Sequence, residues 1–63
     1  MNLREYLGKK IIIIDDEGNK HKGFVEGFTT SEDDDMGQNI IVRYDNSLNI
    51  FYESDIKEIK IIN

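Results

Sequence analysis

The chain has 63 residues, no cysteine, one histidine, and eight basic against thirteen acidic residues, for a net charge of −5. This length predicts one domain, residues 1–63, and the lack of cysteine excludes disulfides and thiolate metal sites. One histidine cannot build a histidine-based zinc site, and we expect neither a metal nor a cofactor. The acidic balance counts against nucleic-acid binding, which gains affinity from Lys and Arg at phosphates. No apolar run is long enough to span a bilayer, which predicts a soluble, cytoplasmic protein.

Residues 2–7 are expected to form a short N-terminal α-helix. Asn2 can cap its start, and Gly8 is suited to end it because glycine readily adopts positive φ. Three apolar side chains would share one face of this helix: Leu3, Tyr6 and Leu7. Two helical turns are not stable alone, so we expect this face to dock on the rest of the fold.

The next two expected strands, roughly residues 9–15 and 20–30, are joined by an acidic turn. The first contains four consecutive isoleucines, whose branching at Cβ favours extended structure and whose run predicts that both faces are covered. The second contains two glycines, and Gly27 is expected to mark a bulge that turns Val25 and Phe28 inward. A long, bent second strand of this kind allows a small barrel to close.

The remaining chain predicts a polar loop and three more strands. Residues 31–38 contain four successive acids, which indicate a solvated loop rather than a cation site because the spaced ligands of a calcium loop are missing. Strands are expected over residues 39–45, 48–53 and 58–62, with a 3₁₀ turn over residues 54–57. A helix and five antiparallel strands predict an all-β fold, a small five-stranded barrel.

Alternation along the strands divides their side chains between two faces. Phe24, Ile41 and Phe51 fall opposite the inferred core, and an outward apolar set of this kind predicts a subunit or partner interface. His21 is expected to face solvent, with no partner indicated for a general-base role. Three basic side chains could align across neighbouring strands as a modest basic patch, although an ordinary exposed strand face is the favoured explanation: Lys20, Lys22 and Arg43.

Short motifs follow one another along residues 2–62: Leu7-Gly8-Lys9, Asp16-Glu17-Gly18, Gly23-x-Val25 with Phe28, Asp34-Asp35-Met36, Ile40-Ile41-Val42 and Ser54-Asp55-Ile56-Lys57-Glu58-Ile59. Together with their hydrophobic spacing, these motifs resemble an Sm-like (LSm) domain, a variant of the SH3-like barrel. The resemblance implies assembly into rings through edge-strand pairing. It also implies, as in many members of the family, binding of uridine-rich RNA at the inner rim of the ring.

The RNA-binding positions of the family are only partly matched in this chain. The family places an Asn after the Asp-x-x-Met-type stretch, whereas Gly37 follows Met36 here, which leaves Asn39 as the candidate RNA contact. The Arg-Gly pair of the family is absent, and both loops that would face RNA are acidic. We therefore predict a non-enzymatic interaction module whose partner is protein, either copies of itself in a homo-oligomer or a larger complex. The alternative is an Sm-like RNA-binding ring protein.

Overall fold

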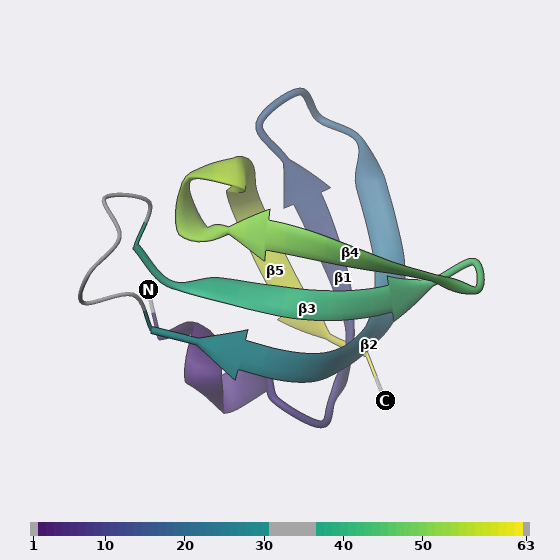
Figure 1. Cartoon of the computed structure of the whole chain (residues 1–63). Coiled ribbons are helices and arrows are strands. Elements are labelled where there is room, and N and C mark those ends of the chain that lie inside the picture. The colour runs from purple at the N-terminus through teal and green to yellow at the C-terminus, as the bar shows by residue number, and fades with distance from the viewer. Residues whose placement is uncertain (1, 31–36, 63) are drawn as a thin grey trace.

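The computed structural model describes residues 2–30 and 37–62 (Figure 1). In these residues one antiparallel sheet has the strand order β4-β3-β2-β1-β5, so the predicted all-β class is confirmed. The sheet is open, with β4 and β5 at its two edges. The predicted acidic loop falls largely on residues 31–36, outside the described residues. In chain order the elements are η1 (Leu3–Tyr6), β1 (Lys10–Asp15), β2 (Lys20–Thr29), β3 (Asn39–Tyr44), β4 (Ser47–Tyr52), η2 (Glu53–Asp55) and β5 (Ile56–Ile61).

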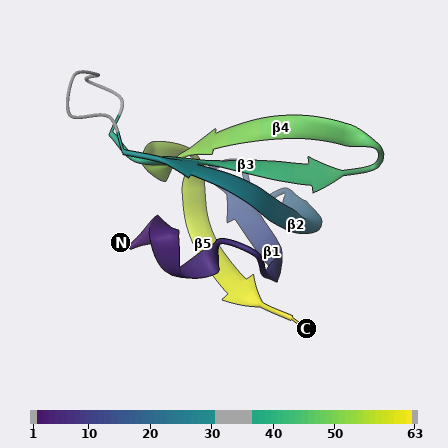
Figure 2. The ribbon, with the colours of Figure 1, turned by 60° about the horizontal axis from the view of Figure 1, so that its bottom comes forward.

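The sheet folds around β2, which pairs with β1 through its first half and with β3 through its second half. Phe24 is the residue at which the pairing changes over, because it lies opposite both Lys10 of β1 and Arg43 of β3. The register then shifts between Val25 and Gly27, which confirms the predicted bulge. The bend brings β3 and β4 over β1 and β5, as Figure 2 shows.

Gly23 lies where β2 and β3 approach each other closely. A Cβ atom built at this position would be 2.5 Å from the carbonyl oxygen of Arg43 and 2.7 Å from Cγ1 of Val42. Backbone and side chain of β3 therefore occupy the space that any larger residue would need. Glycine inside a strand usually marks such a close approach, and here it permits the fold of the sheet.

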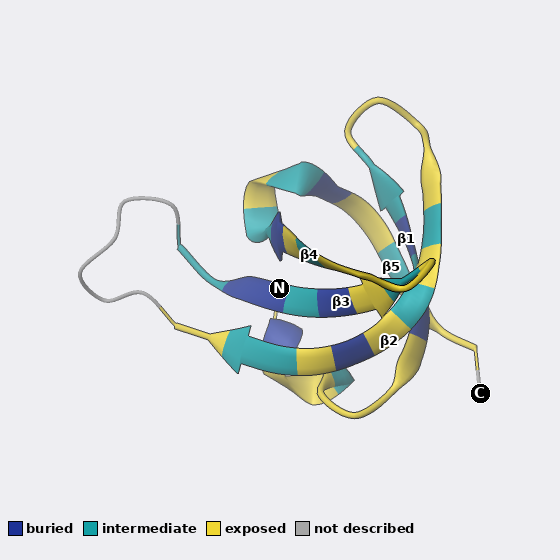
Figure 3. Cartoon of the chain, turned by 45° about the vertical axis from the view of Figure 1, so that its right-hand side comes forward, coloured by how far each residue is buried: buried dark blue, intermediate teal, exposed yellow. Residues whose placement is uncertain are grey.

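The core fills the space between the two layers (Figure 3). Alternation along β1 sends Ile11 and Ile13 into the core, where both are fully buried, while Ile12 and Ile14 lie on the outer face and are half-buried. The expectation that both faces of this strand are covered is therefore met fully on the inner face and in part on the outer face. The buried apolar side chains are Leu3, Ile11, Ile13, Val25, Ile40, Val42, Phe51 and Ile56.

The N-terminal element is a 3₁₀ helix rather than the predicted α-helix. Its start is as predicted, since the Asn2 side chain accepts a hydrogen bond from the Arg4 N–H at 3.3 Å. The helix stops after one turn because the chain then pairs with β2: the Gly8 N–H donates to the Val25 carbonyl at 2.9 Å. Leu3 is buried as expected, but Leu7 is 46% exposed, so the predicted three-residue docking face is wrong at Leu7.

Phe51 lies in the core, contrary to the prediction that it faces outward. The chain turns between β3 and β4 through Asp45 and Asn46, which both adopt positive φ, 53° and 62°. A two-residue turn of this kind sets the register of the hairpin, and it places Ile40 opposite Phe51. Opposing residues share a face of the sheet, so Phe51 points inward with Ile40.

The second 3₁₀ turn begins one residue earlier than predicted, at Glu53. Asp55 closes this turn, because its Oδ2 accepts a hydrogen bond from the Tyr52 N–H at 3.0 Å. The last strand consequently starts at Ile56, whose side chain is buried, rather than at Glu58.

Candidate interaction surfaces

The outer face of β3 and β4 carries three apolar side chains that we call the β4 surface: Ile41, Leu48 and Ile50. Leu48 and Ile50 are 56% and 57% exposed, and Figure 3 shows how much of β4 is open to solvent. Ile50 lies opposite Ile41, which leans over Gly27, since a Cβ there would be 3.2 Å from Cδ1 of Ile41. Of the predicted outward set, Ile41 belongs to this surface and Phe51 does not.

The two edges of the sheet differ in charge. β4 contains neither a charged residue nor a proline, and no strand pairs with its outer side in the part of the chain that the structure describes. An unpaired edge without such features can template pairing with another strand. The opposite edge, β5, carries Lys57, Glu58 and Lys60, all exposed, which protect it from indiscriminate pairing.

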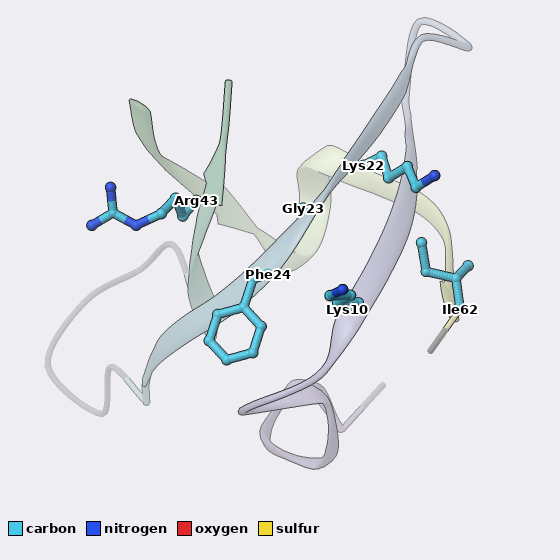
Figure 4. A pocket seen from close by; sticks show the side chains of 6 residues that line it. All are labelled: Lys10, Lys22, Gly23, Phe24, Arg43 and Ile62. Atoms are coloured by element: carbon cyan, nitrogen blue, oxygen red, sulfur yellow. The ribbon is translucent and has the colours of Figure 1, made fainter. Parts of the chain in front are cut away.

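A hollow of about 280 Å³ lies on the outer face of β1 and β2 (Figure 4). Lys10 and Phe24 are direct cross-strand neighbours there, and Lys22 is on the same side of β2. The predicted basic patch is only partly assembled, because Lys22 and Arg43 border the hollow whereas Lys20 does not. The lining residues, which we call the basic hollow, are Lys10, Lys22, Gly23, Phe24, Arg43 and Ile62.

Arg43 is neutralised by Glu26. Its Nε donates to one carboxylate oxygen and its Nη2 to the other, the latter at 3.4 Å. Through this hydrogen bond and the attraction between the opposite charges, Glu26 raises the pKa of Arg43. In Figure 4 the guanidinium extends away from Lys10 and Lys22. The two lysines, which form no ion pair within residues 2–30 and 37–62, therefore supply the free positive charge of the basic hollow.

His21 is partly buried and paired, whereas it was predicted to face solvent. Its Nε2 lies 2.7 Å from Oδ2 of Asp15, and the two side chains are 20% and 15% exposed. The imidazole also packs against two aromatic rings, with centroids 5.5 Å away at Tyr44 and 5.1 Å away at Phe51. The pairing of Ile13 with His21 makes Asp15 a diagonal neighbour on the same face.

Asp15 also closes its own turn. Its Oδ1 accepts hydrogen bonds from the N–H groups of Glu17 and Asn19, at 3.0 and 2.8 Å. The hydrogen bond from His21, followed by that from the Asn19 N–H, lowers the pKa of Asp15. A carboxylate that orients an imidazole also occurs in acid–base sites. Here the imidazole packs against aromatic rings and the carboxylate holds a turn, so the pair fastens the β1–β2 hairpin to the core.

Asn39, the candidate RNA contact, is 9% exposed and lies opposite Tyr52 of β4 and Thr29 of β2. Its side chain therefore offers little surface to a ligand. The Asp34-Asp35-Met36 motif lies outside the described residues.

The described residues contain no group of three or more His, Cys, Asp or Glu side chains placed to hold a metal ion. Over the same residues, every helix is too short or too polar to cross a membrane.

Comparison of the chain with protein-family models, with curated proteins and with solved structures finds no match. The Sm-like resemblance stays a prediction.

Proposed function

We propose that this chain is a non-enzymatic interaction module that associates with protein through β4, and in the first instance with copies of itself. The observation that carries the proposal is the uncharged outer edge of β4 beside the exposed Leu48 and Ile50. Exposed apolar patches on small domains mark protein contacts. An added strand would satisfy the free backbone groups of the edge while its side chains cover the β4 surface.

A second copy of the chain is a suitable partner because, among the residues that the structure describes, the sheet has unpaired edges at β4 and β5. If β4 of one copy pairs with β5 of the next, the contact is head-to-tail, and it produces a ring when the rotation between copies adds up to a full turn. If β4 pairs with β4, the contact is two-fold and stops at a dimer. The ring is the assembly that the resemblance to Sm-like domains implies. RNA binding, the alternative function, is supported less because Asn39 is buried.

The test is the molar mass in solution, measured by light scattering over a series of protein concentrations. We expect the mass of the unchanged protein to rise above 7.4 kDa to a fixed multiple of it. Ile50→Lys places a charge on the β4 surface and should hold the protein at the monomer mass. Because the Ile50 side chain is exposed, the thermal unfolding of the Ile50→Lys protein should still be cooperative.

Leu7→Lys is the matched control, since Leu7 is also an exposed apolar residue but follows η1 rather than lying on β4. This variant should associate like the unchanged protein. A monomer mass for the unchanged protein at every concentration would overturn the proposal. So would an Ile50→Lys protein that associates normally.

A further inference from the structure

Three lysines lie close together on the outer face of β1, β2 and β5. Lys22 and Lys60 are the cross-strand neighbours of Ile12 on its two sides, and Lys10 is two residues away along β1. Glu58 neutralises Lys60, with Nζ and Oε1 3.2 Å apart. No described carboxylate neutralises Lys10 or Lys22 in this way. Like charges on neighbouring strand positions destabilise a sheet, and their placement here favours an anionic ligand.

Apolar side chains border the same lysines. Phe24 is 40% exposed and Ile62 is 38% exposed, and both line the basic hollow. Figure 4 shows them on either side of Lys10. The volume, about 280 Å³, is slightly smaller than that of ligand sites, which span roughly 300–1,000 Å³. It has room for one apolar side chain together with one or two anionic groups, rather than for a large ligand.

We propose that the basic hollow binds an acidic peptide segment of a partner protein. One apolar side chain of the peptide packs between Phe24 and Ile62, and neighbouring carboxylates contact the ammonium groups of Lys10 and Lys22. This surface is separate from β4, so the inference adds a second contact to the proposed function and does not depend on self-association.

Charge favours a peptide over a nucleic acid in this position. A strand of phosphates needs a continuous basic track, and the charge of the hollow stops at Arg43, where Glu26 supplies a negative charge beside Phe24. Apart from the three basic lining residues, the chain has five basic against thirteen acidic residues, which would repel the rest of a polyanion. A short peptide can place its few carboxylates next to Lys10 and Lys22 and avoid the acidic remainder of the surface.

The experiment uses fluorescence anisotropy with a labelled acetyl-Glu-Glu-Leu-Asp-Glu-amide peptide at low salt. The protein carries the Ile50→Lys substitution, so that peptide binding is measured apart from self-association. We expect saturable binding that weakens as salt rises, because exposed charges are screened. Lys10→Gln and Lys22→Gln should each weaken binding about threefold, which corresponds to roughly 0.6 kcal/mol for an exposed ion pair. Phe24→Ser should weaken it further.

Lys57→Gln is the matched control, because it removes the same charge from an exposed position of β5 outside the hollow. It should bind like the Ile50→Lys parent, and a peptide with Ser in place of Leu should bind more weakly. The proposal is overturned if binding is absent at low salt or if the Lys10, Lys22 and Lys57 variants bind equally. It is also overturned if a labelled oligouridylate of the same length binds more tightly and with the same dependence on both lysines.

Discussion

Gly23 and Gly27 lie four residues apart in β2 and meet different surroundings. At Gly23 an added Cβ would approach the Arg43 backbone oxygen to 2.5 Å, and that oxygen can move only if β3 moves. At Gly27 the nearest atom is the terminal methyl carbon of Ile41, at 3.2 Å, and a side-chain end can rotate away. At Gly23 the backbone of β3 therefore leaves no room for a side chain, whereas at Gly27 only the packing of the Ile41 side chain limits the available space.

We expect Gly23→Ala to lower the free energy of unfolding by about 2 kcal/mol or more, because overpacking forces backbone shifts. Gly27→Ala should cost less than about 1 kcal/mol, since Ile41 can adjust. Urea unfolding of both variants measures the difference. Equal midpoints for the two variants would show that the close approach at Gly23 does not restrict the fold.

The contact between Asp15 and His21 makes stability depend on pH. The pKa of Asp15 is lower in the folded chain than its ordinary value, chiefly because of the hydrogen bond from His21. The stabilisation from its ionised form is therefore complete above the ordinary value of about 4. It is lost as the pH falls through the lower, folded value.

Asp15→Asn should reduce stability near neutral pH and flatten the decline of stability with falling pH below about 4. Urea midpoints measured across this range for the variant and the unchanged protein test the prediction, and the two curves should converge at the acid end. Asp16→Asn, in the exposed part of the same turn, is the control, and its curve of urea midpoint against pH should have the same shape as that of the unchanged protein. Parallel curves for Asp15→Asn and the unchanged protein would contradict the role of this pair.

At the scale of elements, the β3–β4 hairpin shows how a short turn decides the use of a whole strand. Asp45 and Asn46 adopt positive φ, which Asn and Asp tolerate better than other residues except glycine. With two residues in the turn, Phe51 faces the core and Ile50 faces out. A turn with one residue more would reverse these faces, because side chains alternate along a strand.

Asn46→Gly should raise the free energy of unfolding by up to about 1 kcal/mol, and Asn46→Ala should lower it by about 1 kcal/mol, because only glycine adopts this conformation without a steric cost. For a domain of this size, 1 kcal/mol shifts the midpoint of thermal unfolding by roughly 4–8 °C. Ser47→Gly is the control, since Ser47 already belongs to β4 and glycine weakens a strand. If Ser47→Gly raised stability as much as Asn46→Gly, the positive φ of Asn46 would not explain the gain.

At the scale of the whole molecule, the bend in β2 produces one buried core and several exposed surfaces. A chain of 63 residues buries a limited share of its surface. Both proposed contacts use what remains outside the core. The β4 surface is apolar and uncharged, while the basic hollow combines cations with an aromatic ring. Because of this contrast, we propose that one chain binds a second copy at the β4 surface and an acidic partner at the basic hollow.

The features that the sequence alone determined depend on local chemistry. The isoleucine run of β1, the Asn2 cap and the bulge at Gly27 were predicted because branching at Cβ, side-chain hydrogen bonding and the freedom of glycine act within a few residues. For the same reason, the strand bounds were predicted to within one residue, apart from the start of β5, which lies two residues earlier than expected.

The tertiary structure alone decided which faces meet. Phe51 was assigned to the wrong face because the register of β4 depends on a two-residue turn, and a change of one residue exchanges the faces of a strand. The contact between Asp15 and His21 forms only once β1 has paired with β2. The pairing of β1 with β2 and β5 likewise brings together Lys10, Phe24 and Ile62. Contacts between distant segments follow from the register of the paired strands, which no local pattern of side chains encodes.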